Sequence, residues 1–369
     1  MTQLLPMSRR AALYLAAGAA ALTFAGPASA EVDFSKKTIE WIIPFAPGGG
    51  SDTWARFNAP FLTKYLPGNP VVVVINEPGG GSTKGTNLFA ARAKPDGLTF
   101  LGTSGSTQFP YLLGDPRVRY DYQDWTVAMV APTGGVVYAS PSLGLTSAED
   151  IAKLKDAKLV YASQGATSLD LVPLLAFKLM GLDVQHVFGF QGRGDGRLAF
   201  ERGEVNIDYQ TSSAYLTNVQ PLVELGQAVP LFSWGVLDAD GNLVRDPTFP
   251  DLPHFGEAYE MLTGQPPSGP EYDSYFAFFT AGFPAQKMAV LPKGTPQEIV
   301  DAYAAAFEAM KADPEYIAAK EPVLGSYEQV TGEAAQVLFE KGTVIAPELR
   351  KSVVDMLSSE YNVVLGAED

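Results

Sequence analysis

The stretch WIIPFAPGGGSD, residues 41–52, is the most informative part of the sequence. An apolar strand runs into three consecutive glycines, and a capping residue and an amphipathic helix follow them. Glycine lets a backbone approach a ligand closely and adopt a positive φ. The first N–H groups of a helix have no intrahelical partner and carry partial positive charge. A strand, a glycine loop and a helix start in this order therefore predict a site for an anion.

Two familiar nucleotide-binding patterns do not fit the glycines of this chain. A Walker A loop needs Gly-Lys followed by Ser or Thr, but in GSTKGT, residues 81–86, the lysine precedes the glycine. A dinucleotide fingerprint needs G-x-G-x-x-G, whereas the glycines at 48–50 continue as Ser-Asp-Thr. A tight turn that merely requires glycine is the alternative interpretation of this loop taken alone.

Two further loops carry small residues with N–H and hydroxyl donors. TSGST, residues 103–107, follows a predicted strand, and YASQGATS, residues 161–168, follows another and opens a helix. Ligands of open α/β sheets bind at the carboxyl ends of the strands. The three loops together therefore predict one shared ligand cleft.

Short β-rich runs alternate with helical patterns along the chain. Many of these runs are continuously apolar, which predicts strands buried on both faces of parallel or mixed sheets. The alternation predicts an α/β fold of two lobes, with the chain crossing between them on structured strands. The predicted strands are residues 39–45, 71–75, 99–103, 126–130, 136–139, 158–162, 185–188, 205–209, 229–232 and 275–280.

Helices are predicted from apolar spacing and from helix-start signals. One begins near Trp54, where Pro60 is expected to kink or split it. Residues 295–298, Thr-Pro-Gln-Glu, predict a capping box with Pro at the first helical position. Residues 238–273 are rich in Pro, Gly and Asp and predict a long loop insertion, with Asp240-Gly241 as a hairpin turn.

Composition and charge exclude several classes of function. The chain has 369 residues, of which 46% are hydrophobic and 18% are charged, as expected of a folded globular protein. Its net charge of −15 argues against nucleic acid and anionic membranes as partners. The lack of cysteine excludes disulfides, Cys-ligated zinc and a thiol nucleophile, and two histidines exclude a His-rich metal site. Residues 238–242 resemble a calcium loop, but Leu243 and Phe249 stand where the EF-hand needs Gly and Glu, so a polar turn is preferred. We expect no metal and no cofactor.

Residues 1–30 have the features of a secretory signal peptide. Arg9-Arg10 precede an apolar run, and Ala-x-Ala at residues 28–30 predicts cleavage before Glu31. The arginine pair resembles a twin-arginine export signal, and ordinary Sec export is the alternative. No later segment reaches 18 consecutive apolar residues, so residues 31–369 are expected to be a soluble exported protein.

Four motifs follow one another along the mature chain. They are Phe-x-Pro-Gly-Gly-x-x-Asp at residues 45–52, Asn-x-Pro-Gly-x-Gly at 76–81, Pro-Asp-Gly at 95–97 and Gly-Thr-Ser-Gly at 102–105. This ordered set resembles the extracytoplasmic solute receptors of the tripartite tricarboxylate transporter family, the Bug-type receptors. The likeness continues through residues 161–171, 186–192, 203–216 and 291–295, and so covers essentially the whole mature chain.

The resemblance implies a type II periplasmic-binding-protein fold with a ligand cleft between two α/β lobes. We expect residues 31–137 with 272–369 to form lobe 1, and residues 138–271 to form lobe 2. The implied function is periplasmic capture of a small mono-, di- or tricarboxylate, without catalysis, and its delivery to membrane permease subunits by a monomeric receptor.

The resemblance also implies that main-chain N–H groups and ordered waters hold the ligand carboxylate. The candidate ligand-binding residues are Phe45, Ala46, Gly48, Gly49, Gly50, Asp52, Ser104, Gly105, Ser106, Gln164, Gly165, Ala166, Thr167, Asp208 and Gln210.

Departures from the family pattern leave the identity of the carboxylate open. Glu77 stands where the family often has a basic residue, and Gln191 where it often has Lys or Arg. Gln210 stands where Asp is frequent, and Asp208 either faces the cleft or caps a strand end. A less ordinary acid, or one with an extra polar or cationic group, would fit these changes.

Other tempting residues have simpler interpretations. Trp41 and Trp54 are expected in the core, and His186 is expected to be a hydrogen-bonded structural residue. Arg193 and Arg197 are either solvated or help to hold a second carboxylate. A secreted hydrolase using the same cleft is an alternative, although the chain has no G-x-S-x-G elbow. A ligand-sensing receptor for signalling is another.

Overall fold

The computed structural model describes residues 32–238 and 240–365, and the predicted signal peptide lies outside them. The described residues from Asp33 onward form one compact unit.

The first sheet mixes parallel and antiparallel strands. The sheet has the order β2-β1-β3-β12-β4. Its parallel strands are β1 (Thr38–Ile43), β2 (Val71–Asn76) and β3 (Thr99–Ser104). β12 (Lys287–Leu291) runs antiparallel between β3 and β4 (Thr126–Ala131), so a late strand completes the sheet.

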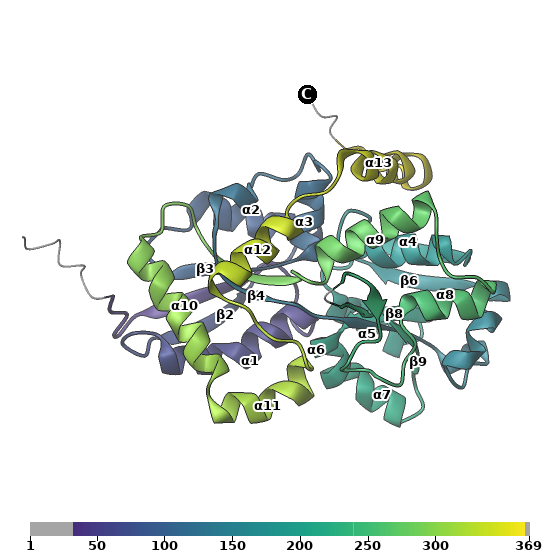
Figure 1. The fold of residues 1–369 in the computed structure, drawn as a ribbon, viewed down its shortest axis with the longest axis horizontal. Helices are drawn as coiled ribbons and strands as arrows, with labels where there is room; N and C mark the ends of the chain where they lie inside the picture. The colour runs from purple at the N-terminus through teal and green to yellow at the C-terminus, as the bar shows by residue number, and fades with distance from the viewer. Residues whose placement is uncertain (1–31, 239, 366–369) are drawn as a thin grey trace, which may run out of the picture. The chain divides into compact units, whose positions relative to one another are not determined.

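Helices pack around the first sheet, and segments far apart in sequence lie together there. Trp41 and Trp54 are buried, as predicted, with ring centroids 4.9 Å apart. α1 packs on α10 and α11, which come from the last quarter of the chain (Figure 1). The helices are α1 (Gly50–Tyr65), α2 (Thr83–Arg92), α3 (Gly105–Leu112), α10 (Gln297–Lys311), α11 (Pro314–Leu324) and α12 (Gly332–Gly342). Pro60 lies inside α1, which continues through it instead of splitting.

The remaining strands form a three-stranded antiparallel sheet, β8-β5-β9, a parallel pair, β6-β7, and a short hairpin. Their bounds are β5 (Gly135–Ala139), β6 (Leu159–Ser163), β7 (Val184–Phe188), β8 (Ile207–Thr211) and β9 (Val229–Ser233). The helices of this part are α4 (Leu171–Leu179), α5 (Arg193–Glu201), α6 (Ser212–Ala214), α7 (Gln220–Glu224) and α8 (Phe255–Thr263), and α5 packs on β6 and β8. α9 (Pro270–Gly282) and α13 (Pro347–Tyr361) pack against each other.

The predicted strand at residues 275–280 is wrong, because this segment lies inside α9. Tyr275, Phe278 and Phe279 are buried, and this spacing of three and four residues is that of one helix face. Gly269 is the N-cap and Pro270 opens the first turn, where its missing N–H costs nothing. The strand that the prediction missed is β12.

Of three local predictions, one is confirmed, one is incomplete and one is wrong. The hairpin turn at Asp240-Gly241 is confirmed, because β10 (Val236–Leu237) pairs antiparallel with β11 (Leu243–Val244). The long loop at 238–273 is interrupted by α8, whose start is capped by His254 and Glu257. The capping box at 295–298 does not form, since Thr295 Oγ1 donates to the carbonyl of Pro292.

His186 is structural, but not through the expected hydrogen bond. Its ring packs against Tyr161, Phe177, Phe188 and Tyr361. Its Nδ1 is buried without a hydrogen-bond partner among the described residues. Burial lowers the pKa of His186 to about 4, so the ring is neutral in its aromatic surroundings at neutral pH.

Candidate functional site

A small cavity lies where the ends of strands from different sheets meet. Its volume is about 20 Å³, which is room for about one water molecule. Residues at the ends of β1, β3, β6 and β8 and the residue before β12 contribute to its wall. The lining residues are Phe45, Gly49, Gly50, Ser51, Ser104, Ser106, Gln164, Leu169, Arg193, Thr211 and Gln286.

The N-termini of α1 and α5 meet at this cavity, backbone against backbone. Gly49 is the N-cap of α1 and Gly192 is the N-cap of α5, and neither helix has a side-chain cap. A Cβ placed on Gly49 would lie 3.4 Å from the amide nitrogen of Gly194. A Cβ on Gly194 would lie 2.8 Å from the carbonyl oxygen of Pro47. Two uncapped helix starts, each with unpaired N–H groups and the positive end of a helix dipole, therefore face each other.

The glycine loop itself takes the form that its sequence requires. Gly48 has a φ of 82°, in the left-handed region that favours glycine. Gly50 sits so close to β8 that a Cβ on it would collide with Thr211 Oγ1. The hydroxyl of Ser213, two residues beyond Thr211, donates to the carbonyl of Gly50 at 3.1 Å.

Further hydrogen bonds join the two sides of the cavity. The amide of Ala46 donates to the carbonyl of Gln191 at 3.3 Å. The amide of Leu169 donates to Ser106 Oγ at 3.1 Å. At the rim, the hydroxyl of Thr167 donates to Asp115 Oδ2 at 3.0 Å. The loops after β1 and β3 are thus held against those after β6 and β7.

Arg193 is buried in the cavity wall, and four residues of the chain bind its guanidinium. Its guanidinium forms ion pairs with Asp208 and, at 3.4 Å, with Asp170 Oδ2. It also donates to the carbonyls of Ala162 and Tyr209. Burial opposes its charge, but Tyr161, Asp170 and the other groups around it raise the pKa of Arg193 above the ordinary value. Its charge is therefore matched by acids of the chain itself.

The solvated interpretation of the two arginines is wrong, whereas Arg193 does line the cavity. Arg193 is buried, and two buried acids more than balance its charge, because one cation is paired with two carboxylates. Arg197 is also largely buried, and it pairs with Glu201 one turn further along α5.

The structure brings six of the fifteen candidate residues around the cavity. They are Phe45, Gly49, Gly50, Ser104, Ser106 and Gln164. The side-chain nitrogen of Gln164 is buried without a partner among the described residues, which makes it an available donor. The hydroxyl of Ser104 accepts from the amide of Ser106 at 3.1 Å and so caps α3.

Asp208 and Gln210 do not line the cavity. Both are fully buried in β8 behind Arg193. Asp208 accepts from the hydroxyl of Tyr138 at 2.5 Å and pairs with Arg193, so its carboxylate neither faces the cavity nor caps a strand end. Gln210 donates to the carbonyl of Arg193 at 2.8 Å.

The other candidates are occupied by local hydrogen bonds or packing. Asp52 accepts from the amide of Gly48 at 2.9 Å and pairs with Arg56, so it fixes the loop and uses the Gly48 donor. Gly105 lies against Leu169. The amide of Gly165 donates to Ser163 Oγ. Ala46, Ala166 and Thr167 also lie outside the lining.

Sequence reasoning missed five of the lining residues. Thr211 lies just beyond a predicted strand, and Ser51 lies within the quoted glycine stretch, so both were within reach of the pattern. Gln286 was hidden because β12 was not predicted. Leu169 enters through long-range packing, for which a single sequence carries no signal. Arg193 was considered for a second carboxylate but was not among the fifteen candidates.

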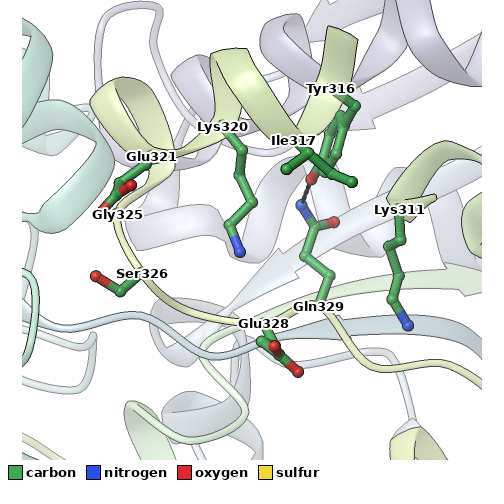
Figure 2. A pocket seen from close by; sticks show the side chains of 9 residues that line it. All are labelled: Lys311, Tyr316, Ile317, Lys320, Glu321, Gly325, Ser326, Glu328 and Gln329. Carbon is green, nitrogen blue, oxygen red and sulfur yellow. Dashed lines mark hydrogen bonds between the residues drawn. The ribbon is translucent and has the colours of Figure 1, made fainter. Parts of the chain in front are cut away.

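A larger pocket of about 490 Å³ lies elsewhere, between α11 and the segment that follows it (Figure 2). Lys311, Lys320, Glu321 and Glu328 line it, so both signs of charge are present. It contains neither of the two uncapped helix starts, and we do not assign the ligand to it.

Among the helices of the described residues, none is both long and apolar enough to cross a bilayer.

Comparison with known proteins identifies relatives along most of the chain. Residues 55–338 match the family described as the tripartite tricarboxylate transporter family receptor. A UPF0065 protein of Bordetella pertussis is 30% identical over 297 residues, which cover 78% of this chain and 81% of that protein.

Solved structures show the same fold at lower sequence identity. The periplasmic binding protein BugD is 22% identical, with a TM-score of 0.66 over 88% of this chain and 98% of that chain. Rpa4515 of R. palustris, solved with adipate, is 21% identical, with a TM-score of 0.68 over 87% of this chain and 98% of that chain. These likenesses confirm the predicted periplasmic-binding-protein class of α/β fold.

Proposed function

The chain belongs to the receptor family of the tripartite tricarboxylate transporters, and we propose that the cavity between α1 and α5 binds the carboxylate of a small organic acid. The observation that carries this proposal is the meeting of two uncapped helix starts at Gly49 and Gly194. The N–H groups of both helix starts carry partial positive charge, and Gly49 and Arg193, one from each start, line the same small space. A carboxylate is the group that such a space accepts best.

The expected energies of these contacts are large enough for micromolar binding without a basic side chain on the carboxylate. A helix start contributes up to about 2 kcal/mol toward an anion when it is partly buried. Each hydrogen bond to a charged group adds about 1.5–3 kcal/mol. A few such bonds reach the roughly 8 kcal/mol of a micromolar complex after the costs of association.

Ligand entry requires the two sides of the cavity to separate, because room for about one water is too small for an organic acid. We assign these sides to the predicted lobes, residues 31–137 with 272–369 and residues 138–271. Sheet membership supports the division: β4 lies in the first sheet, β5 in the second, and β12 returns to the first. The bonds across the cavity, such as that from Ala46 to Gln191, would break on opening and re-form around the ligand.

The cellular role follows from the same proposal. Residues 1–30 act as a signal peptide cleaved before Glu31, and the mature receptor works in the periplasm as a monomer. It hands its ligand unchanged to membrane permease subunits and performs no catalysis. Adipate bound to the structural relative Rpa4515 makes dicarboxylates the first ligands to test.

Calorimetric titration of purified residues 31–369 with mono-, di- and tricarboxylates tests this function. We expect one-to-one binding of at least one free acid at about micromolar affinity and its full recovery after incubation. The matching dimethyl ester, which keeps the carbon chain but removes the charges, should not bind. Binding of no carboxylate in the panel would contradict the proposed function, and steady consumption of the ligand would favour a hydrolase.

A further inference from the structure

Lys287 is a buried lysine that follows Gln286, a lining residue of the candidate site, and that lines a separate small space itself. It opens β12 and pairs with Ser104 of β3 and Ala131 of β4 in the middle of the first sheet. Only 2% of its surface is exposed. None of the ion pairs among the described residues involves it, and its Nζ donates at 2.5 Å to the side-chain oxygen of Gln286. Burial lowers the pKa of Lys287 to about 7.

The surroundings of Lys287 connect it to the start of α1. The small space beside it is lined by Trp54, Ser213, Tyr327 and Gln329, among others. Trp54 belongs to the first turns of α1, and Ser213 is bonded to the carbonyl of Gly50. On its other side, Gln329 bonds to Tyr316 and forms part of the wall of the outer pocket in Figure 2.

The charged and titratable groups on the neighbouring elements are paired or exposed, except Asp246, which is fully buried without an ion pair among the described residues and accepts from Tyr327. On α1, Asp52 is paired with Arg56. In the segment after α11, Tyr327 donates to Asp246, and Glu328 is exposed. Neither β3 nor β4 carries a charged residue within its bounds.

Lys287 is thus a buried basic group, one residue from the cavity lining, with which no acid of the described residues forms an ion pair. Arg193, in the cavity wall, is paired with two acids, Asp170 and Asp208, so that cluster carries a net charge of −1. An unpaired buried charge is costly, so a counter-charge supplied by a ligand would relieve the cost. Gln286 connects Lys287 to the cavity. Its side-chain oxygen accepts from Lys287 Nζ, and Gln286 lines the cavity. An amide held by its oxygen presents its NH₂ as a donor.

We propose that Lys287, acting through the amide of Gln286, is a positioning residue that supplies the positive charge for the bound carboxylate. This inference rests on the proposed function and deepens it. The two helix starts give direction to the carboxylate, and protonated Lys287 adds a positive charge that offsets the net −1 of Arg193 with Asp170 and Asp208. The receptor therefore prefers the free acid over a neutral isostere by more than backbone N–H groups alone provide.

Lys287→Met, which nearly conserves side-chain volume, tests the inference with adipate as the probe, or with the tightest binder of the carboxylate panel. We expect the dissociation constant to rise by about 10- to 100-fold, the range of one hydrogen bond to a charged group. We also expect the melting temperature at pH 6 to rise by about 2–4 °C, because an unpaired buried charge is gone. A purely structural lysine would lower both affinity and melting temperature.

The pH dependence of stability gives a second readout of the same variant. The pKa of Lys287 in the folded chain, about 7, lies below its ordinary value of 10.5. Between these values the unfolded chain binds more protons, so wild-type stability rises with pH, and Lys287→Met should lack this rise.

Two further variants complete the test. Lys320→Met, in the outer pocket of Figure 2, removes another partly buried lysine and should leave affinity unchanged. Gln286→Leu keeps Lys287 but removes the connecting amide, and it should weaken binding without raising the melting temperature. If Lys287→Met and Gln286→Leu both bind adipate as the wild type does, the inference fails and the proposed function stands. If the wild type binds no carboxylate, the proposed function itself fails.

Discussion

Gly194→Ala is expected to weaken carboxylate binding by about 10- to 100-fold while the fold survives, since overpacking a close contact costs about 1–3 kcal/mol. The added Cβ would lie 2.8 Å from the carbonyl oxygen of Pro47 and 2.9 Å from the carbonyl carbon of Gly48. Both are backbone atoms, which cannot turn aside as a side chain can. The two helix starts would be held apart, and the N–H groups could not close on one ligand.

The unliganded fold should survive this change with a small loss of stability, because the close contact is present there too and is offset only in part by the helix preference of alanine. Gly194 lies in the first turn of α5 at a φ that any residue adopts, and alanine favours a helix over glycine by about 1 kcal/mol. Calorimetric titration with the ligand and thermal unfolding without it separate the two effects. Leu198→Ala, on the exposed face of the same helix, is the matched control. Gly49→Val approaches the same contact from α1 with a larger side chain and should abolish binding. Wild-type affinity in both glycine variants would show that the helix starts are not part of the binding site.

Arg193→Met is expected to destabilise the protein by about 3–5 kcal/mol, the usual cost of removing one partner from a buried ion pair. Asp170 and Asp208 are fully buried and would both lose their cation. The rings of Tyr161 and Tyr209, which lie 5.0 and 4.8 Å from the guanidinium carbon, would lose a cation contact as well. Urea unfolding measures the loss directly.

A surface arginine provides the control for this prediction. Arg202→Met removes an exposed arginine that pairs with Glu204, and it should change stability little. Adding Asp208→Asn to Arg193→Met should recover part of the lost stability, because one orphaned charge is then removed. Equal and small effects of Arg193→Met and Arg202→Met would show that Arg193 does not hold this part of the fold together.

The glycine loop could be predicted from the sequence because its signals are local. An apolar strand, three glycines and an amphipathic helix follow one another within residues 41–65, and each element depends on its neighbours in the chain. The role of Arg193 could not be predicted in this way. Its acids lie 23 and 15 residues away in sequence, and the fold alone brings them together.

The segment at 275–280 shows how a local signal can mislead. Its aromatic residues favour a strand by propensity, but burial of Tyr275, Phe278 and Phe279 on one face makes it a helix. This error hid β12, and with it Gln286 and Lys287, the two residues on which the charge of the site depends. Tertiary packing outweighed intrinsic propensity at this position.

N–H groups from the starts of α1 and α5 are expected to bind one carboxylate together. The most direct test of this binding is an amide NMR titration of glycine-labelled residues 31–369 with the tightest-binding acid. The account predicts downfield shifts of the Gly49, Gly50 and Gly194 amide protons, with Gly181 and Gly226 on distant turns unchanged. Saturation with the acid that leaves the glycines of either helix start unshifted would contradict it.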